Sequence, residues 1–132
     1  MKKFLLLVLL AGTCVLARAA ESAPAPAAPP KPKTFLMILR PVPRLHDEKA
    51  WSQADQAATG AHFARLKAAT DAGQVILAGR TAEPLNLTQG LVIFTAKDEA
   101  AAREFMEADP CVAAGVFTAT LHPYDLALLR KN

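Results

Sequence analysis

The order of apolar runs and alanine-rich, proline-free segments limits this chain to few folds. The apolar runs are five to seven residues long, which is typical of strands in a small sheet. They predict strands over residues 34–40, 74–80, 91–95 and 115–121. The alanine-rich segments predict helices over residues 51–72 and 98–108. With a turn over residues 83–89, the chain reads β-α-β-β-α-β.

Residues that favour helix ends lie at the boundaries of these segments. Asp47 or Ser52 is placed to cap the first helix, and Gly73 is placed to end it. Asp98 is placed to cap the second helix, and Asp109, which is followed by proline, stops it. The capping residues therefore support the same element order as the apolar runs.

This order predicts an α+β domain of the split β-α-β, ferredoxin-like type over residues 34–130. Such a domain has a four-stranded antiparallel sheet with two helices on one face. The strands are apolar at nearly every position, as in Leu36, Met37, Ile38 and Leu39, which is typical of a sheet buried on both faces. We therefore expect a second copy of the chain to cover the free face, giving a homodimer.

The first 19 residues have the three parts of a secretory signal peptide. Lys2 and Lys3 precede an apolar run over residues 4–16, and small residues end the segment at Ala19. The run has 13 residues, and a stable membrane anchor takes roughly 20. We expect cleavage after Ala19 and a periplasmic or secreted protein. The alternative, a lipoprotein acylated at Cys14, is less favoured because apolar residues continue beyond that cysteine.

The net charge of +3 comes from the signal segment. Three of the 15 Lys and Arg residues lie before Ala19, and none of the 12 Asp and Glu residues does, so the cleaved chain is neutral. It therefore lacks the basic character that nucleic-acid binding requires.

Residues 20–33 are rich in proline and alanine and predict a disordered linker. Cys111 remains as a single cysteine, which we expect to be buried rather than bridged.

Three short motifs resemble the YCII-related family of YciI-like proteins. The first is the run HFARLK from His62, and the second is DAGQVILAG from Asp71. The third is EADP from Glu107, with AGVF following from Ala114. The motifs occur in the order and spacing typical of the family and cover nearly all of residues 34–129.

The resemblance implies a dimeric α+β barrel built from ferredoxin-like units. It also implies an active site centred on a His-Asp pair, which by motif is His62 and Asp109. A chlorinated-hydroquinone dehydrochlorinase resembles the family, whereas many members have no known activity. The chain departs from the family pattern at Thr59, Arg80 and Cys111, so the surroundings of the pair are expected to differ.

A histidine oriented by a carboxylate is the minimal unit for general acid/base catalysis. On a helical wheel Thr59, Phe63, Leu66 and Thr70 form a stripe expected to face the sheet, with His62 at its flank. Two structural readings stay open beside the catalytic one. Asp109 could only bond backbone amides at the helix exit, and His62 could be a core histidine. Asp55, the alternative carboxylate, lies seven residues before His62 and is too distant for direct contact.

Other candidate residues carry weaker signals. Arg80 follows a strand-ending glycine and could hold an anionic group of a substrate. Tyr124 could donate a hydrogen bond. The histidines at positions 46, 62 and 122 show no i, i+4 spacing, and the chain has no C-x-x-C motif. The sequence thus predicts neither a metal site nor a cofactor.

Three functional hypotheses remain. The first is an exported lyase or isomerase that acts on a small aromatic or carbonyl compound with His62 and Asp109. The second is a non-catalytic periplasmic module whose cavity binds a small ligand. The third is a protein-interaction domain with a flat surface. Contact between the histidine and the carboxylate at a cleft favours the first, and an apolar pocket without that contact favours the second.

Overall fold

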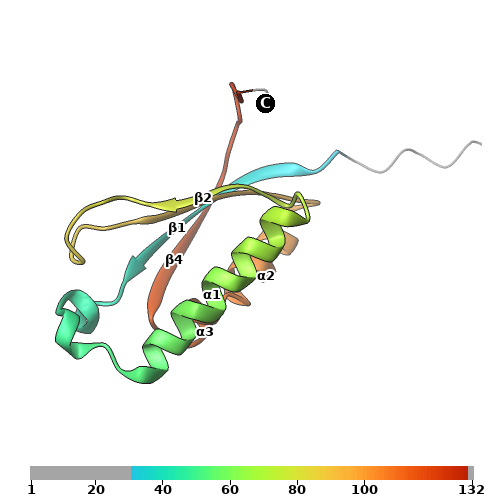
Figure 1. The fold of residues 1–132 in the computed structure, drawn as a ribbon. Coiled ribbons are helices and arrows are strands. Elements are labelled where there is room, and N and C mark those ends of the chain that lie inside the picture. Colours follow the sequence, from blue (N-terminus) through green and yellow to red (C-terminus); the bar gives the residue numbers. More distant parts are fainter. Residues whose placement is uncertain (1–30, 131–132) are drawn as a thin grey trace, which may run out of the picture.

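Four strands form a single antiparallel sheet in the order β2-β3-β1-β4 (Figure 1). The protein is represented by a computed structural model that describes residues 31–130. The expected signal peptide, residues 1–19, and most of the expected linker, residues 20–33, lie outside these residues. The strands are β1 (Lys33–Pro41), β2 (Val75–Arg80), β3 (Gly90–Ala96) and β4 (Phe117–Pro123). Two antiparallel neighbours flank β1, which pairs with β3 and with β4.

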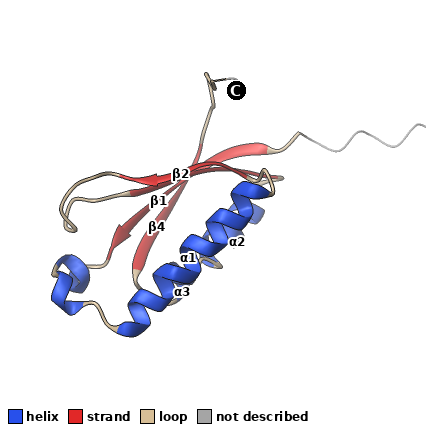
Figure 2. Ribbon diagram, viewed as in Figure 1, coloured by secondary structure: helices blue, strands red, loops and turns tan. Residues whose placement is uncertain are grey.

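The helices lie together on one face of this sheet (Figure 2). They are α1 (Gln53–Asp71), α2 (Glu99–Glu107) and the single turn α3 (Pro110–Ala113). Alternate residues of the central strands, such as Phe35, Met37 and Phe94, point toward the helices and form the core. The element order and the sheet confirm the prediction of a ferredoxin-like α+β domain. No helix within residues 31–130 is both long and apolar enough to cross a bilayer.

The helices do not cover the opposite face of the sheet, which is aliphatic over β1, β2 and β3 and polar on β4, at Thr120 and His122. Leu36 pairs with Ile93 and Ile38 pairs with Leu91, so these four side chains lie on one face. Leu77 extends the group, because it also pairs with Ile93. We call these five residues the open face. The expectation that both faces of the sheet are apolar is met over β1, β2 and β3, and the homodimer inferred from it stays a prediction.

Local signals account for both ends of α1. Ser52 caps its start in a reciprocal capping box with Asp55, and Gly73, at φ +78°, follows its last turn. The helix begins at Gln53 rather than at the expected residue 51, because Ser52 provides the cap. Asp47, the other candidate, caps one of two short 3-10 helices, Pro43–His46 and Glu48–Ala50, that the sequence did not predict.

Asp109 does more than end the second helix. α2 ends at Glu107, and Asp109 caps the start of α3, which the sequence did not predict. Gly115, at φ +67°, then turns the chain into β4. This strand covers Phe117–Pro123 instead of residues 115–121, and its terminal proline is tolerated because β4 is an edge strand.

Candidate active site

α1 turns His62 toward the interior. The expected stripe is half right: Leu66 is buried and Thr59 is half-buried. Phe63 is 71% exposed and Thr70 also lies at the surface, so these two positions are wrong. The buried face includes Asp55 and His62 in their place. Most of the helix is alanine and polar residues, so its sequence defines the buried face only weakly.

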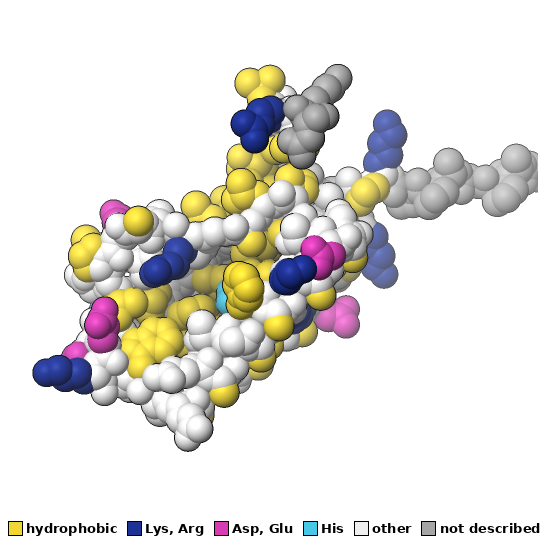
Figure 3. All heavy atoms as spheres, in the orientation of Figure 1, with side chains coloured by type: hydrophobic (Ala, Val, Ile, Leu, Met, Phe, Trp, Pro, Cys, Tyr) yellow, Lys and Arg dark blue, Asp and Glu magenta, His cyan; other side chains and the backbone are white. Residues whose placement is uncertain are grey.

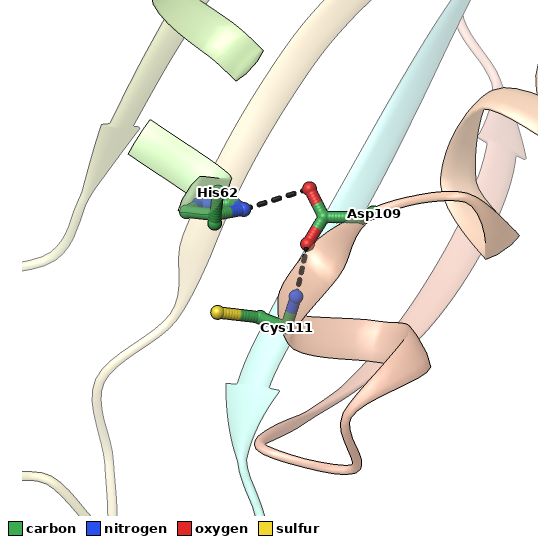
Figure 4. A group of neighbouring side chains, drawn as sticks. All are labelled: His62, Asp109 and Cys111. Carbon is green, nitrogen blue, oxygen red and sulfur yellow. Dashed lines mark hydrogen bonds and ion pairs between the residues drawn. The ribbon is translucent and has the colours of Figure 1, made fainter. Parts of the chain in front are cut away.

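The carboxylate of Asp109 binds His62 and the start of α3 at the same time (Figure 4). His62 Nδ1 donates to Oδ2 over 2.7 Å, and the Cys111 amide donates to Oδ1 over 2.9 Å. An ionised carboxylate only accepts hydrogen bonds, so the proton of the neutral imidazole lies on Nδ1. Nε2 is then the basic nitrogen, and no residue among 31–130 hydrogen-bonds to it. The ring also packs nearly perpendicular to the ring of Phe117, with centroids 5.8 Å apart.

Asp109 is fully buried, whereas the His62 side chain is 14% exposed. Burial alone would raise the pKa of Asp109. The hydrogen bond and charge of His62, the Cys111 amide and the charge of Arg65 outweigh burial, so the pKa of Asp109 lies below its usual value. The carboxylate is therefore ionised at neutral pH and can orient the imidazole.

Arg65 is a member of this group that the sequence analysis missed. Its Nη1 lies 3.7 Å from Asp109 Oδ2, and its Nη2 donates to the Phe105 carbonyl over 2.9 Å. The guanidinium stacks 4.2 Å from the centre of the Phe105 ring. Arg65 follows His62 by three residues, so the helical i, i+3 spacing was a signal that could have identified it.

Cys111 and Thr59 also belong to the surroundings of the pair. Cys111 is buried, as expected, and its Sγ lies 3.7 Å from Thr59 Oγ1. Burial raises the pKa of the Cys111 thiol, so the group is a thiol at neutral pH and not a ready nucleophile. The sequence placed Cys111 two residues from Asp109 but gave no sign of its contact with α1.

Donor atoms of His62, Asp109 and Cys111 lie within 4.8 Å of one another. This donor set suits a soft divalent metal such as zinc. However, Asp109 already uses one oxygen for the imidazole and the other for a backbone amide. A metal would have to displace the imidazole proton and deprotonate a thiol whose pKa is raised. The cluster is thus a hydrogen-bonded His-Asp pair beside a buried thiol, and its donors are not arranged as metal ligands.

The exposed side of His62 lines a pocket of about 740 Å³ between α1 and the β2–β3 side of the sheet. Figure 3 shows this hollow, with hydrophobic side chains around a histidine and basic side chains at its rims. The aromatic residues of the wall are Trp51, Phe63 and Phe117. A largely apolar cavity with a few polar groups is typical of a site for a small molecule.

Arg80, the third candidate from the sequence, also lines this pocket. Lys67 is a second cation in the wall, but it forms an ion pair of 2.6 Å with Asp71. No ion pair of Arg80 is found within residues 31–130. Arg80 is therefore the basic side chain of the wall that is best placed to meet an anionic group.

Other candidates lie away from the pair. Asp55 accepts two hydrogen bonds from Arg44, of 3.0 and 2.6 Å, and others from Ser52. It does not contact His62, as the spacing on α1 predicted, and binds Arg44 and Ser52 instead. His122 contacts Thr120 on β4. His46 meets the Pro41 carbonyl, and Tyr124 uses its amide to extend the pairing with β1.

The similarity of this chain to known proteins identifies its family. A search of curated proteins finds no match. Among solved structures, the chain is similar to 5-chloro-2-hydroxyhydroquinone dehydrochlorinase from Burkholderia phenoliruptrix AC1100, in complex with 2,5-dihydroxybenzoquinone. The identity is 18%, the match covers 70% of this chain and 93% of that chain, and the TM-score is 0.48. The family model of the YCII-related domain matches residues 35–121, which include both His62 and Asp109. The chain therefore belongs to the family of YCII-related domains.

Proposed function

We propose that this domain catalyses proton transfer on a small aromatic or carbonyl compound, as a lyase or an isomerase. The observation that carries the proposal is the 2.7 Å bond between His62 and buried Asp109 at the wall of an apolar pocket. A carboxylate that holds one nitrogen of an imidazole leaves the other as an oriented base.

In this proposal Nε2 of His62 takes a proton from a carbon next to a carbonyl or from a phenol. Asp109 stabilises the imidazolium that forms and does not itself take the proton. In an isomerisation the same proton returns to another atom of the substrate. In an elimination a leaving group departs with its electron pair, and His62 can supply the proton that it needs.

Arg80 gives the proposed site a preference for substrates with an anionic group. A guanidinium binds a carboxylate through two parallel hydrogen bonds, and it can donate to the single oxygen of a phenolate. Trp51, Phe63 and Phe117 line the same cavity and suit a flat apolar body. The substrate expected from these residues is a small aromatic or unsaturated compound that carries one negative group.

The test uses two matched probes, acetophenone and 4-acetylbenzoate, incubated with the protein in D₂O. Exchange of the methyl protons next to the carbonyl is followed by NMR. His62→Gln should reduce the exchange of both probes by roughly 10²-fold or more, the size of a general-base contribution. Arg80→Gln should slow only 4-acetylbenzoate. His122→Gln, which changes an exposed histidine on β4, is the matched control and should have no effect. Absence of exchange above the buffer rate with both probes would contradict the proposal.

The apolar wall of the pocket also supports a second candidate, a module that binds a small ligand without changing it. The two functions differ in proton exchange. A module that only binds should bind 4-acetylbenzoate in calorimetry, in the parent protein and in Asp109→Asn, without exchange of its methyl protons in either. Exchange in the parent protein that is lost in Asp109→Asn, with binding retained, supports catalysis.

We also propose that two copies pack through the open face as a homodimer. The face presents five aliphatic side chains, and Leu77 among them is 52% exposed. The segment after β4 runs away from the body of the domain (Figure 1) and exposes Leu128 by 92% and Leu129 by 65%. Light scattering at micromolar concentration should give a dimer for the parent protein and a monomer for Ile93→Lys. Ala64→Lys, on the exposed side of α1, is the control. A monomeric parent protein would overturn the proposal.

Export to the periplasm or the medium is the last part of the proposal, and it depends on the sequence of residues 1–19. The N-terminus of protein produced in a bacterial host can be identified by mass spectrometry. An N-terminus at Ala20 supports cleavage by signal peptidase, and an acylated Cys14 indicates the lipoprotein alternative. A cytoplasmic protein that retains residues 1–19 would refute export.

A further inference from the structure

We propose that Arg65 is a positioning residue of the site, which supplies the positive charge that keeps Asp109 ionised while His62 is a neutral base. This inference deepens the proposed acid/base function and rests on it. It assigns a role to a residue outside the His-Asp pair and outside the pocket wall. The observations behind it are an ion-pair distance, the burial of the carboxylate and an unpartnered nitrogen.

The first observation is the position of the Arg65 guanidinium beside the buried carboxylate. Nη1 lies 3.7 Å from Oδ2 of Asp109, the same oxygen that binds His62. Asp109 is fully buried, and a buried carboxylate without a nearby cation is strongly disfavoured. When His62 is neutral, Arg65 is the cation that remains next to this carboxylate.

The second observation is the hydrogen bonding of Arg65. Nη2 donates to the Phe105 carbonyl, and the Phe105 ring lies against the guanidinium. Nη1 is buried and has no hydrogen-bond partner among the described residues. A buried donor without a partner is costly, so its retention calls for a reason beyond packing. The position of Nη1 near Asp109 gives that reason. At 3.7 Å the positive charge of Arg65 still attracts the carboxylate, although the distance is too long for a hydrogen bond.

Other titratable groups near the pair do not replace the charge of Arg65. The Cys111 thiol of α3 is neutral, and Lys67 across the pocket is neutralised by Asp71. Arg80 of β2 lies in the opposite wall of the pocket. Within residues 31–130, Arg65 is therefore the cation that offsets the buried carboxylate when His62 is neutral.

A carbon NMR titration of the side-chain carboxyl groups tests this without a substrate. The signal of Asp109 is identified by its loss in Asp109→Asn. Arg65→Gln, which keeps a donor for the Phe105 carbonyl but removes the charge, should move the midpoint of the Asp109 signal to higher pH. Arg65→Lys keeps the charge and should restore most of the parent midpoint. Arg103→Gln removes a surface arginine paired with Glu99 and is the matched control.

A folded Arg65→Gln protein with an unchanged Asp109 midpoint would overturn the inference. If this variant does not fold, Arg65→Met replaces it, because a methionine side chain can cover Phe105 without burying an amide. If neither neutral variant folds while Arg65→Lys does, the charge is needed for folding itself, and a role in the ionisation of Asp109 is overturned. The proposed enzymatic function fails separately, because it is judged by proton exchange and not by this titration.

Discussion

Replacing Asp109 with asparagine is expected to move the proton of neutral His62 from one ring nitrogen to the other. In the parent protein both oxygens of Asp109 accept hydrogen bonds, from His62 Nδ1 and from the Cys111 amide. An asparagine has one oxygen, which the backbone amide of Cys111 claims, so its NH₂ group faces the imidazole. Nδ1 then becomes the acceptor, and the proton lies on Nε2. The nitrogen that faces the pocket is no longer a base.

The cost to folding can be worked from the same contacts. The substitution removes a charge-assisted hydrogen bond and leaves the Arg65 guanidinium without its carboxylate, 3.7 Å away. Loss of one partner of a buried ion pair costs about 3–5 kcal/mol. We expect about 3 kcal/mol, at the lower end of that range, because asparagine keeps the volume and the bond to the Cys111 amide. This corresponds to a fall in Tm on the order of 15 °C for a domain of this size.

The assay is long-range ¹⁵N–¹H NMR of the histidine rings at a pH where His62 is neutral. It should show Nδ1–H in the parent protein and Nε2–H in Asp109→Asn. An orienting Asp→Asn change in a His-Asp pair can lower kcat on the order of 10⁴-fold, so proton exchange should fall to a similar extent. If the variant keeps the Nδ1–H form, or folds as stably as the parent protein, the geometric argument for the pair is wrong.

Two further predictions concern stability. The pKa of Asp109 is lower in the folded protein than in the unfolded chain, so the ionised carboxylate stabilises the folded state. This stabilisation is complete above the pKa of the unfolded chain, near 4, and is lost as the pH falls through the lower pKa of the folded protein. Urea midpoints should therefore drop below pH 4, and they should drop less steeply in Asp109→Asn; equal slopes would contradict the role of Asp109. Gly73→Ala should lower stability by about 1 kcal/mol, because residue 73 has φ +78°. Gly60→Ala should raise stability by about 1 kcal/mol, because residue 60 lies within α1 and an added Cβ meets nothing within 4 Å. Equal effects of the two substitutions on stability would refute the assignment of the helix end at Gly73.

The fold was predictable because its signals are local. The apolar runs, Ser52 at the start of α1 and Gly73 after its end each depend on neighbouring residues. The rotation of α1 was not predictable in the same way. Alanine at many of its positions leaves several faces nearly equal in hydropathy, and packing decides which one is buried. Phe63 was therefore assigned to the sheet, whereas it lies at the pocket with most of its surface exposed.

The site required contacts that spacing alone does not reveal. His62 and Asp109 lie 47 positions apart, and it was the family motif that paired them. Arg65 and Thr59 lie within one turn of His62 on α1, but their contacts with Asp109 and Cys111 arise only when α3 packs against that helix. These contacts were missed because the sequence did not predict α3.

The two readings of Asp109 that the sequence left open, a helix cap and an orienting carboxylate, are both present in the structure. One oxygen caps α3 and the other binds His62. Loss of the whole side chain therefore cannot separate the two roles, but Asp109→Ser can. Serine caps helices about as well as aspartate, yet it is shorter, uncharged and has no second oxygen for His62.

Asp109→Ser should keep the Cys111 amide protected from hydrogen exchange while His62 loses its fixed tautomer and the site loses its proton-exchange activity. Asp109→Ala should lose both roles and be less stable than the serine variant by about 1 kcal/mol, the usual contribution of an N-cap. The difference in stability between the alanine and serine variants then measures the contribution of the helix cap. The difference between the serine variant and the parent protein measures the contribution of the His62–Asp109 pair. If the serine variant matched the parent protein in both stability and exchange, Asp109 would be a helix cap alone, and the interpretation of His62 as an oriented base would fail.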